Sequence, residues 1–182
     1  MPRSTPDAGG PRVYLVTGPS AAGKTSVARL LAQRFEAAVH LEGDFFRRSI
    51  VSGRHEMTPA ATPEALAQLR LRYRLATSAA NAYVAEGLTV ILEDVVGGPM
   101  LAEVVEMLGG NRPTVIVLLP DVPSLAAREA GRDERGYGAW NIAELHRLFG
   151  ELTPRIGTWL DTSGQSPEET VEAILRLRLS EV

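Results

Sequence analysis

The residue with the clearest chemistry in this 182-residue chain is its only lysine, Lys24. It stands in the octapeptide Gly18-Pro19-Ser20-Ala21-Ala22-Gly23-Lys24-Thr25, which fits the pattern G-x-x-x-x-G-K-[ST] of a phosphate-binding P-loop. The other eighteen basic residues are all arginines. A compact ammonium group can reach the β- and γ-phosphates from within such a loop, whereas a wide, planar guanidinium does not fit there. The motif therefore predicts a nucleotide-binding site.

Each part of this motif has an expected role. The loop amides and the N-terminus of the following helix would cradle the phosphates, Lys24 would offset charge on the transferring phosphoryl group, and the Thr25 hydroxyl would bind Mg²⁺. The predicted cofactors are ATP and Mg²⁺. GTP is disfavoured, because a guanine-reading Asn-Lys-x-Asp motif needs a second lysine. The expected nucleotide contacts here are Gly18, Pro19, Ser20, Ala21, Ala22, Gly23, Lys24, Thr25 and Ser26.

Two acids follow an apolar run later in the chain. The run Val90-Ile91-Leu92 leads directly into Glu93 and Asp94, which is typical of a buried strand that ends in carboxylates. Such a strand would place one carboxylate near Mg²⁺, and Asp94 is the preferred metal ligand ahead of Glu93. The alternative is that both acids only solvate a loop.

Asp44 is the candidate group on the side of the phosphoryl acceptor. It follows the strand-like run 38–42, which would end at the same sheet edge as the P-loop. There its carboxylate would accept the proton of a hydroxyl that attacks the γ-phosphate. The alternative role is an N-cap for a helix that begins at Phe45. Arg47 and Arg48 either hold an anionic substrate group or lie solvated on that helix.

Arg128, Arg132 and Arg135 lie where a helical pattern gives way to glycine and charge. This composition is typical of a mobile lid, which we expect over about residues 131–140. Lid arginines can stabilise charge on the transferring phosphoryl oxygens, and at least one of the three is predicted to be catalytic. The alternative is an exposed loop with interspersed charges.

Five short apolar runs predict the strands that position these groups. They cover residues 13–17, 38–42, 89–93, 114–119 and 158–161. Helical patterns alternate with them at 25–35, 63–86, 100–108, 124–130, 142–152 and 167–179. The alternation predicts an α/β fold with a parallel sheet covered on both faces, which binds ligands beyond the carboxyl ends of its strands. On the long second helix, Arg70 and Arg74 share a face that is predicted to be solvated.

Composition excludes several other classes. A net charge of −3 and a pI near 5.7 give no general attraction to nucleic acid or to a membrane surface. Without cysteine, and with scattered His40, His55 and His146, the sequence shows no zinc or redox pattern. Residues 1–12 are predicted to be a flexible leader before a single domain over 13–182. A cytoplasmic protein is expected, a monomer or homodimer, whose partner is a small hydroxyl-bearing substrate.

Taken together, these segments resemble the P-loop small-molecule kinases, which include shikimate and gluconate kinases and chloramphenicol phosphotransferase. The resemblance covers most of the chain after Arg12 and rests on the P-loop, Glu42-Gly43-Asp44, Leu92-Glu93-Asp94-Val95, the lid arginines and Asp161-Thr162-Ser163. It implies a three-layer P-loop NTPase fold with strand order 2-3-1-4-5. It also implies that Asp44 is the acceptor-side base, Arg128 lies near the adenine, Arg132 lies near the phosphates, and the loop from Thr162 contacts the base.

The acceptor segment departs from the shikimate kinase pattern. Those enzymes carry a second acid two positions away and a further arginine, whereas Asp44 here is followed by Phe45 and Phe46. We therefore expect phosphorylation of a hydroxyl on a larger, antibiotic-like natural product. The alternatives are a nucleoside, nucleotide or sugar-acid kinase and, in another class, a binding protein regulated by ATP.

Overall fold

The computed structural model describes residues 12–131 and 136–179. Its centre is a five-stranded parallel sheet in the order β2-β3-β1-β4-β5, which confirms the order implied by the resemblance. The strands are β1 (Val13–Thr17), β2 (Ala38–Glu42), β3 (Thr89–Glu93), β4 (Thr114–Leu118) and β5 (Thr158–Leu160). Residues 1–11 of the predicted leader, and Arg132 and Arg135 of the predicted lid, lie outside the described residues.

The register of the strands decides which residues meet at the carboxyl edge of the sheet. Val16 of β1 and Glu42 of β2 both pair with Glu93 of β3, so the P-loop and both acidic strand ends emerge side by side. Strands β1 and β3 are buried along their whole length. Their unbroken apolar sequence is typical of strands that helices cover on both faces of the sheet.

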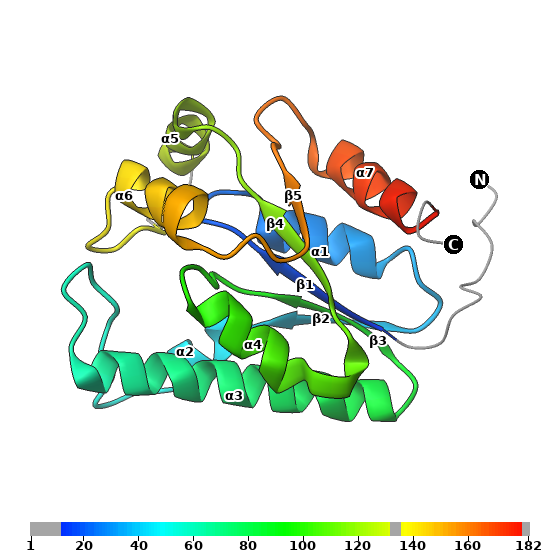
Figure 1. The fold of residues 1–182 in the computed structure, drawn as a ribbon, viewed down its shortest axis with the longest axis horizontal. Coiled ribbons are helices and arrows are strands. Elements are labelled where there is room, and N and C mark those ends of the chain that lie inside the picture. Colours follow the sequence, from blue (N-terminus) through cyan, green and yellow to red (C-terminus); the bar gives the residue numbers. More distant parts are fainter. Residues whose placement is uncertain (1–11, 132–135, 180–182) are drawn as a thin grey trace.

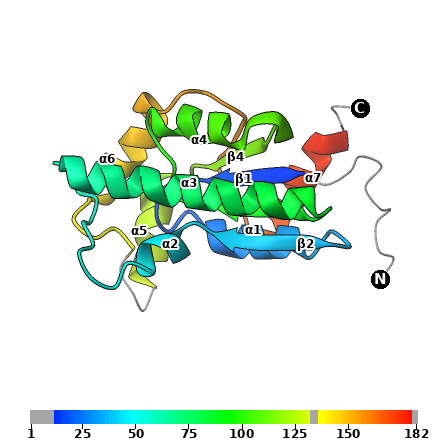
Figure 2. The same ribbon diagram turned by 90° about the horizontal axis from the view of Figure 1, so that it is seen from below.

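Seven α-helices surround the sheet among the described residues (Figure 1). They are α1 (Lys24–Ala32), α2 (Asp44–Arg48), α3 (Pro63–Ala85), α4 (Met100–Leu108), α5 (Val122–Ala130), α6 (Ile142–Arg147) and α7 (Pro167–Leu179). Helices α1 and α7 pack on one face, and α3 and α4 cover the other, where α3 runs along the whole sheet (Figure 2). This is the expected three-layer arrangement. None of the described helices combines the length and apolar character needed to cross a bilayer.

Local capping explains where the helices differ from the sequence-based prediction. Asp121 accepts a hydrogen bond from the Ser124 amide, so α5 begins at Val122 rather than at Ser124. The alternative role of Asp44 as an N-cap is wrong, because Gly43 occupies the cap position and Asp44 is the first helical residue.

The predicted helix over 142–152 is divided in two. Helix α6 ends at Arg147, and the π-helical turn Leu148–Leu152 follows it. This turn places Phe149 fully in the core beneath Gly97, where an added Cβ would lie 3.1 Å from the phenyl ring. The loop after β3 therefore rests directly on an aromatic side chain.

Candidate active site

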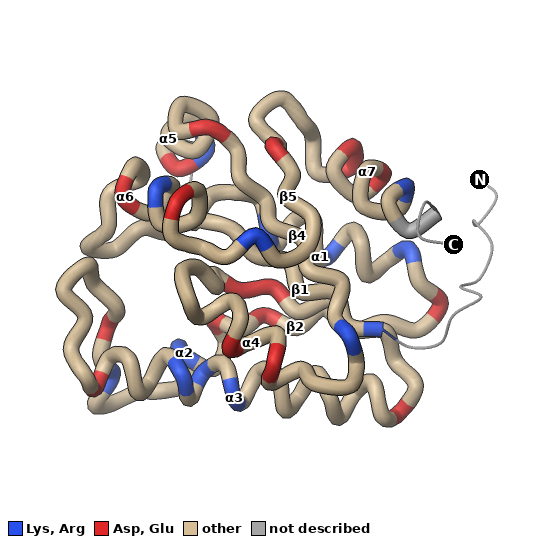
Figure 3. The backbone as a smooth tube through the Cα atoms, viewed as in Figure 1, with Lys and Arg blue, Asp and Glu red and all other residues tan. Residues whose placement is uncertain are grey.

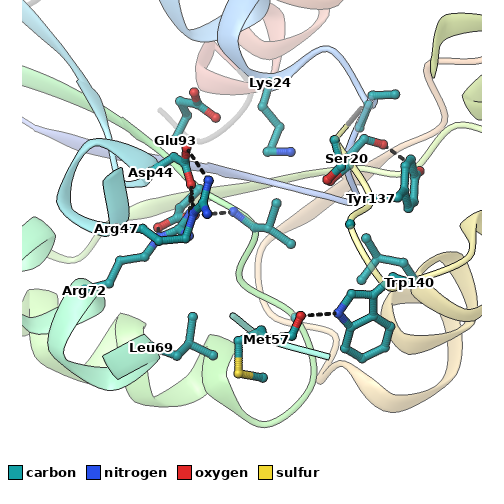
Figure 4. A pocket seen from close by; sticks show the side chains of 18 of the residues that line it. Ser20, Lys24, Asp44, Arg47, Met57, Leu69, Arg72, Glu93, Tyr137 and Trp140 are labelled. Atoms are coloured by element: carbon teal, nitrogen blue, oxygen red, sulfur yellow. Dashed lines mark hydrogen bonds and ion pairs between the residues drawn. The ribbon is translucent and has the colours of Figure 1, made fainter. Parts of the chain in front are cut away.

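A cavity of about 1270 Å³ opens at the carboxyl edge of the sheet. The P-loop forms one wall, the ends of β2 and β3 form the adjoining wall, and helix α3 also lines the space (Figure 4). The described end of the lid and the residues before α3 complete the lining. A single space therefore joins the predicted donor side, at Lys24, to the predicted acceptor side, at Asp44.

The P-loop adopts a backbone that its glycines make possible. Gly18 has φ +147°, and a Cβ there would lie 2.2 Å from the Leu118 carbonyl oxygen of β4. Gly23 has φ +93°, in the region that favours glycine. The Lys24 ammonium donates to the Pro19 carbonyl at 2.9 Å, and the residue is only 8% exposed. The charge is thus held inside the loop, at the start of α1.

Thr25 and Glu93 form the candidate metal-binding pair. The Thr25 hydroxyl donates to Glu93 Oε1 at 2.8 Å, and Glu93 is 7% exposed at the end of β3. This contact brings a hydroxyl and a carboxylate together at the P-loop, which suits a hard cation such as Mg²⁺. The geometry favours Glu93 over the sequence-preferred Asp94 as the acidic partner of Thr25.

Asp94 makes its contacts with Arg72 of α3, a residue that the sequence analysis did not select. Arg72 binds both carboxylate oxygens of Asp94, with Nε donating at 2.7 Å, and also lies 3.3 Å from Asp44 Oδ1. The Val95 amide donates to Asp94 Oδ1 as well, at 2.6 Å. A Cβ on Gly43 would lie 2.0 Å from Asp94 Oδ2, so the turn after β2 must carry glycine for Asp94 to occupy this place.

Helical spacing was the signal that would have identified Arg72. The residue lies three positions after Leu69 and four before Ala76, and both of these pack on the core. An arginine on the buried stripe of a helix needs an acidic partner, whereas Arg70 faces Glu103 at the surface. The partner of Arg72 was not visible in the sequence, because Asp94 is 22 residues away.

Asp44 is the first residue of α2 and lies among arginines. Arg47 Nε donates to its Oδ1 at 2.7 Å, and Arg47 also binds Glu56 at 2.8 Å. Burial raises the pKa of Asp44, but the hydrogen bond from Arg47 and the charges of Arg72, Arg47 and Arg48 outweigh it and leave the pKa below its ordinary value. The carboxylate is therefore ionised throughout the neutral range. Figure 3 shows these acidic strand ends beside the basic positions of α2 and α3.

Beyond the charged residues around Asp44, the cavity also has a set of apolar lining residues. The indole Nε1 of Trp140, from the end of the lid, donates to the Met57 carbonyl at 3.3 Å and closes one side of the space. Leu69 faces the same space from α3 (Figure 4). The apolar lining residues are Met57, Leu66, Leu69, Val95, Met100, Trp140, Leu145 and Leu148.

Arg128 joins two segments of the predicted nucleotide site. Its guanidinium donates to the Ala22 carbonyl of the P-loop at 3.3 Å and to the Thr162 carbonyl after β5 at 2.6 Å. The Thr162 hydroxyl is buried and has no hydrogen-bond partner among the described residues. Both residues line the cavity, on the P-loop side. A catalytic role for Arg128 stays a prediction, as does the role of the undescribed Arg132.

Described residues of the predicted lid contact the P-loop through hydrogen bonds. The Tyr137 hydroxyl donates to the Ser20 carbonyl at 2.7 Å, and the Ser20 hydroxyl donates to the Gly136 carbonyl at 2.8 Å. Sequence reasoning assigned Ser20 only to phosphate binding. In the structure, Ser20 also holds Gly136 and Tyr137 of the predicted lid.

Replacing Arg72 by methionine is expected to destabilise the fold strongly. Asp94 would be left as a buried charge, 3% exposed, without its cation. Loss of one partner of such a pair costs about 3–5 kcal/mol. Urea denaturation at pH 7 measures the change, and Arg70→Met is the matched control because it removes an exposed pair two residues away. Equal stability losses in the two variants would contradict the structural role of Arg72.

Comparisons with known proteins agree with the fold described above. A family model described as chloramphenicol phosphotransferase-like protein matches residues 11–177. A sugar kinase from a Janibacter species has a TM-score of 0.69 at 20% identity, over 91% of this chain and 93% of that chain. Shikimate kinase from Acinetobacter baumannii, in complex with shikimate, has a TM-score of 0.67 at 22% identity, over 94% of each chain.

A third solved structure is the tunicamycin resistance protein of Deinococcus radiodurans, with a TM-score of 0.64 at 16% identity, over 92% of this chain and 95% of that chain. At these identities the three likenesses establish a shared fold. No curated protein sequence matches this chain.

Proposed function

Because this chain belongs to the chloramphenicol phosphotransferase-like family and is therefore a phosphotransferase, we propose that it transfers the γ-phosphoryl group of ATP to a hydroxyl of a mostly apolar natural product. Lys24 and Asp44 line the same cavity (Figure 4). This arrangement would bring donor phosphate and acceptor hydroxyl together in one space.

The charge balance around Asp44 is the observation that carries the choice of acceptor. Arg72 is matched by Asp94 and Asp44, and Arg47 is matched by Asp44 and Glu56. A carboxylate or phosphate on the acceptor would have to compete with these acids for each guanidinium. Apolar side chains such as Met57, Leu69 and Trp140 line the cavity beyond these paired charges, so an uncharged hydroxyl compound with a sizeable apolar body fits better.

The residues on the donor side fit a nucleotide. The Gly18–Gly23 backbone and the N-terminus of α1 form a phosphate cradle, and Lys24 stands where it can turn from Pro19 to the phosphates. The buried Thr162 hydroxyl, which has no partner in the described part of the chain, and the Arg128 guanidinium suit the base side. When bound, ATP supplies the phosphoryl group, and Mg²⁺ neutralises part of its charge. Thr25 and Glu93 are the residues that would hold the ion.

Asp44 would orient the acceptor and receive its proton. Its depressed pKa makes it a weak base, which suits a loose transition state in which the hydroxyl loses its proton late. Because Arg47 and Arg72 hold the carboxylate from α2 and α3, its position is fixed before the acceptor arrives.

A coupled ADP-release assay with a panel of alcohols tests this function. The panel contains chloramphenicol and other uncharged apolar alcohols, nucleosides, gluconate and shikimate, each with ATP and MgCl₂. We expect stimulation by uncharged apolar alcohols and little by the carboxylates. Stimulation confined to gluconate or shikimate would overturn the acceptor class, and stimulation confined to nucleosides would indicate a nucleoside kinase. ATP binding without stimulated ADP release by any compound would favour an ATP-regulated binding protein.

A further inference from the structure

We propose that His40, Glu42 and Glu93 form a site for a divalent transition-metal ion of the class Mn²⁺, Co²⁺ or Zn²⁺, next to the proposed Mg²⁺ site, with which it would share Glu93. One ligand atom from each of the three residues lies within 4.8 Å of the other two. Two ligand atoms on one ion with bonds of about 2.1 Å lie at most about 4.2 Å apart. Small side-chain adjustments would therefore close the three residues around one ion.

The parallel pairing of β2 and β3 creates this cluster. His40 and Glu42 are two residues apart on β2, so their side chains share a face. Glu42 is the register partner of Glu93, which adds the third group from the neighbouring strand. Ala38, on the same face of β2, packs in the cluster formed with α1. The site therefore lies on the α1 side of the sheet, whereas Asp94 contacts α3 on the other side.

His40 provides the second observation that points to a ligand. Its Nε2 atom is buried and has no hydrogen-bond partner among the described residues. A buried ring nitrogen without a partner is costly, and metal binding is one way in which proteins satisfy it. Imidazole nitrogen favours transition metals over Mg²⁺, and the two carboxylates keep the set suitable for Mn²⁺ as well as for Zn²⁺.

The charges around the cluster also favour a cation. Glu42 has only a long contact of 3.4 Å with Arg48, in which both side chains are substantially exposed. Glu93 is largely buried and accepts a hydrogen bond from a neutral hydroxyl, that of Thr25. A carboxylate has two oxygens and can accept from Thr25 with one while it binds an ion with the other. Glu93 would thus link the proposed ion to the P-loop.

Isothermal titration of the untagged, nucleotide-free full chain with ZnCl₂ and with MnCl₂ tests the proposal. We expect one ion to bind the wild type in the presence of excess MgCl₂, because Mg²⁺ prefers all-oxygen octahedral sites. His40→Gln should weaken binding at least about tenfold, since even the loss of a partner outside the coordination shell costs about 10–100-fold. His55→Gln is the matched control, because His55 lies outside the cluster. The metal affinity of this variant should equal that of the wild type.

A measurement on the wild type keeps the test independent of the folding of variants. The chain has three histidines, so substoichiometric Mn²⁺ should broaden the ring-proton NMR signals of one histidine before the other two. Unchanged affinity in His40→Gln, an equal loss in His55→Gln, or uniform broadening of all three histidines would overturn the proposal. These readouts do not depend on phosphotransfer, so they can fail while the proposed function stands.

Discussion

Lys24→Met is expected to lower phosphotransfer from ATP by at least about 100- to 1000-fold, the usual cost of removing one preorganised group that meets transition-state charge. The ammonium lies within the P-loop at 2.9 Å from the Pro19 carbonyl, and it is the only lysine in the chain. No other lysine can replace it. Single-turnover transfer to the acceptor found in the ADP-release assay measures the effect, and near-normal transfer would contradict the P-loop mechanism.

Lys24→Arg separates the shape of the group from its charge. The guanidinium keeps the positive charge but is planar and wide, so we expect this variant to lose nearly as much activity as Lys24→Met. Thermal unfolding should show that both variants remain folded. If Lys24→Arg kept wild-type activity, a diffuse positive charge would be sufficient, and the argument from the compact ammonium would be wrong.

Asp44→Asn is expected to leave ATP affinity nearly unchanged and to lower transfer to the acceptor by about 100- to 10,000-fold, the range typical of a general base. Asparagine keeps the size of the side chain but cannot accept a proton from the hydroxyl. Nucleotide titration and the transfer rate, measured on the same preparation, separate the two effects. A normal transfer rate with the asparagine would reduce Asp44 to an ion-pair partner of α2 and α3.

Glu56→Gln is the matched control for this prediction. Glu56 also binds Arg47, at 2.8 Å, so its replacement removes an ion pair with the same arginine. Its side chain is half exposed, and we expect a much smaller loss of transfer. Equal losses in both variants would assign the effect to Arg47 rather than to the Asp44 carboxylate.

The pH profile of the wild type gives a second measure of the role of Asp44. Because its pKa in the folded protein lies below the ordinary value of 3.8, the carboxylate stays ionised as the pH falls through the mildly acidic range. Its ion pairs stabilise the fold above the unfolded-state pKa, and this contribution is lost as the pH falls through the folded-state pKa. Transfer should therefore show no acidic limb from Asp44 between about pH 5 and 7.

Local sequence was sufficient for most of the elements and for the P-loop. The strand runs, the long helix and the P-loop glycines were all recognised, because periodicity and turn chemistry act within a few residues. Thr62 accepts from the Ala65 amide at 3.2 Å, as its position before Pro63 indicated. The helix over 142–152 was predicted less well, since the π-helical turn depends on the packing of Phe149 under a distant loop.

The sequence could not decide which acid serves which purpose. Glu93 and Asp94 are adjacent, and a strand alternates its side chains between the two faces, so they contact different layers of the fold. Glu93 meets Thr25 of α1, while Asp94 meets Arg72 of α3. The preference for Asp94 as metal ligand came from residue type alone. It did not take into account the face of the sheet on which each side chain lies.

The amino-acid sequence by itself determined that this chain has a P-loop between a strand and a helix, with Lys24 as its only lysine and Asp44 following the second strand. The tertiary structure alone decided that Arg72 holds Asp44 and Asp94 together, and that His40 and Glu42 meet Glu93. The physical reason is the parallel sheet. Each parallel connection crosses over through a helix or long loop, so side chains that meet at the strand ends are separated in sequence by an entire crossover.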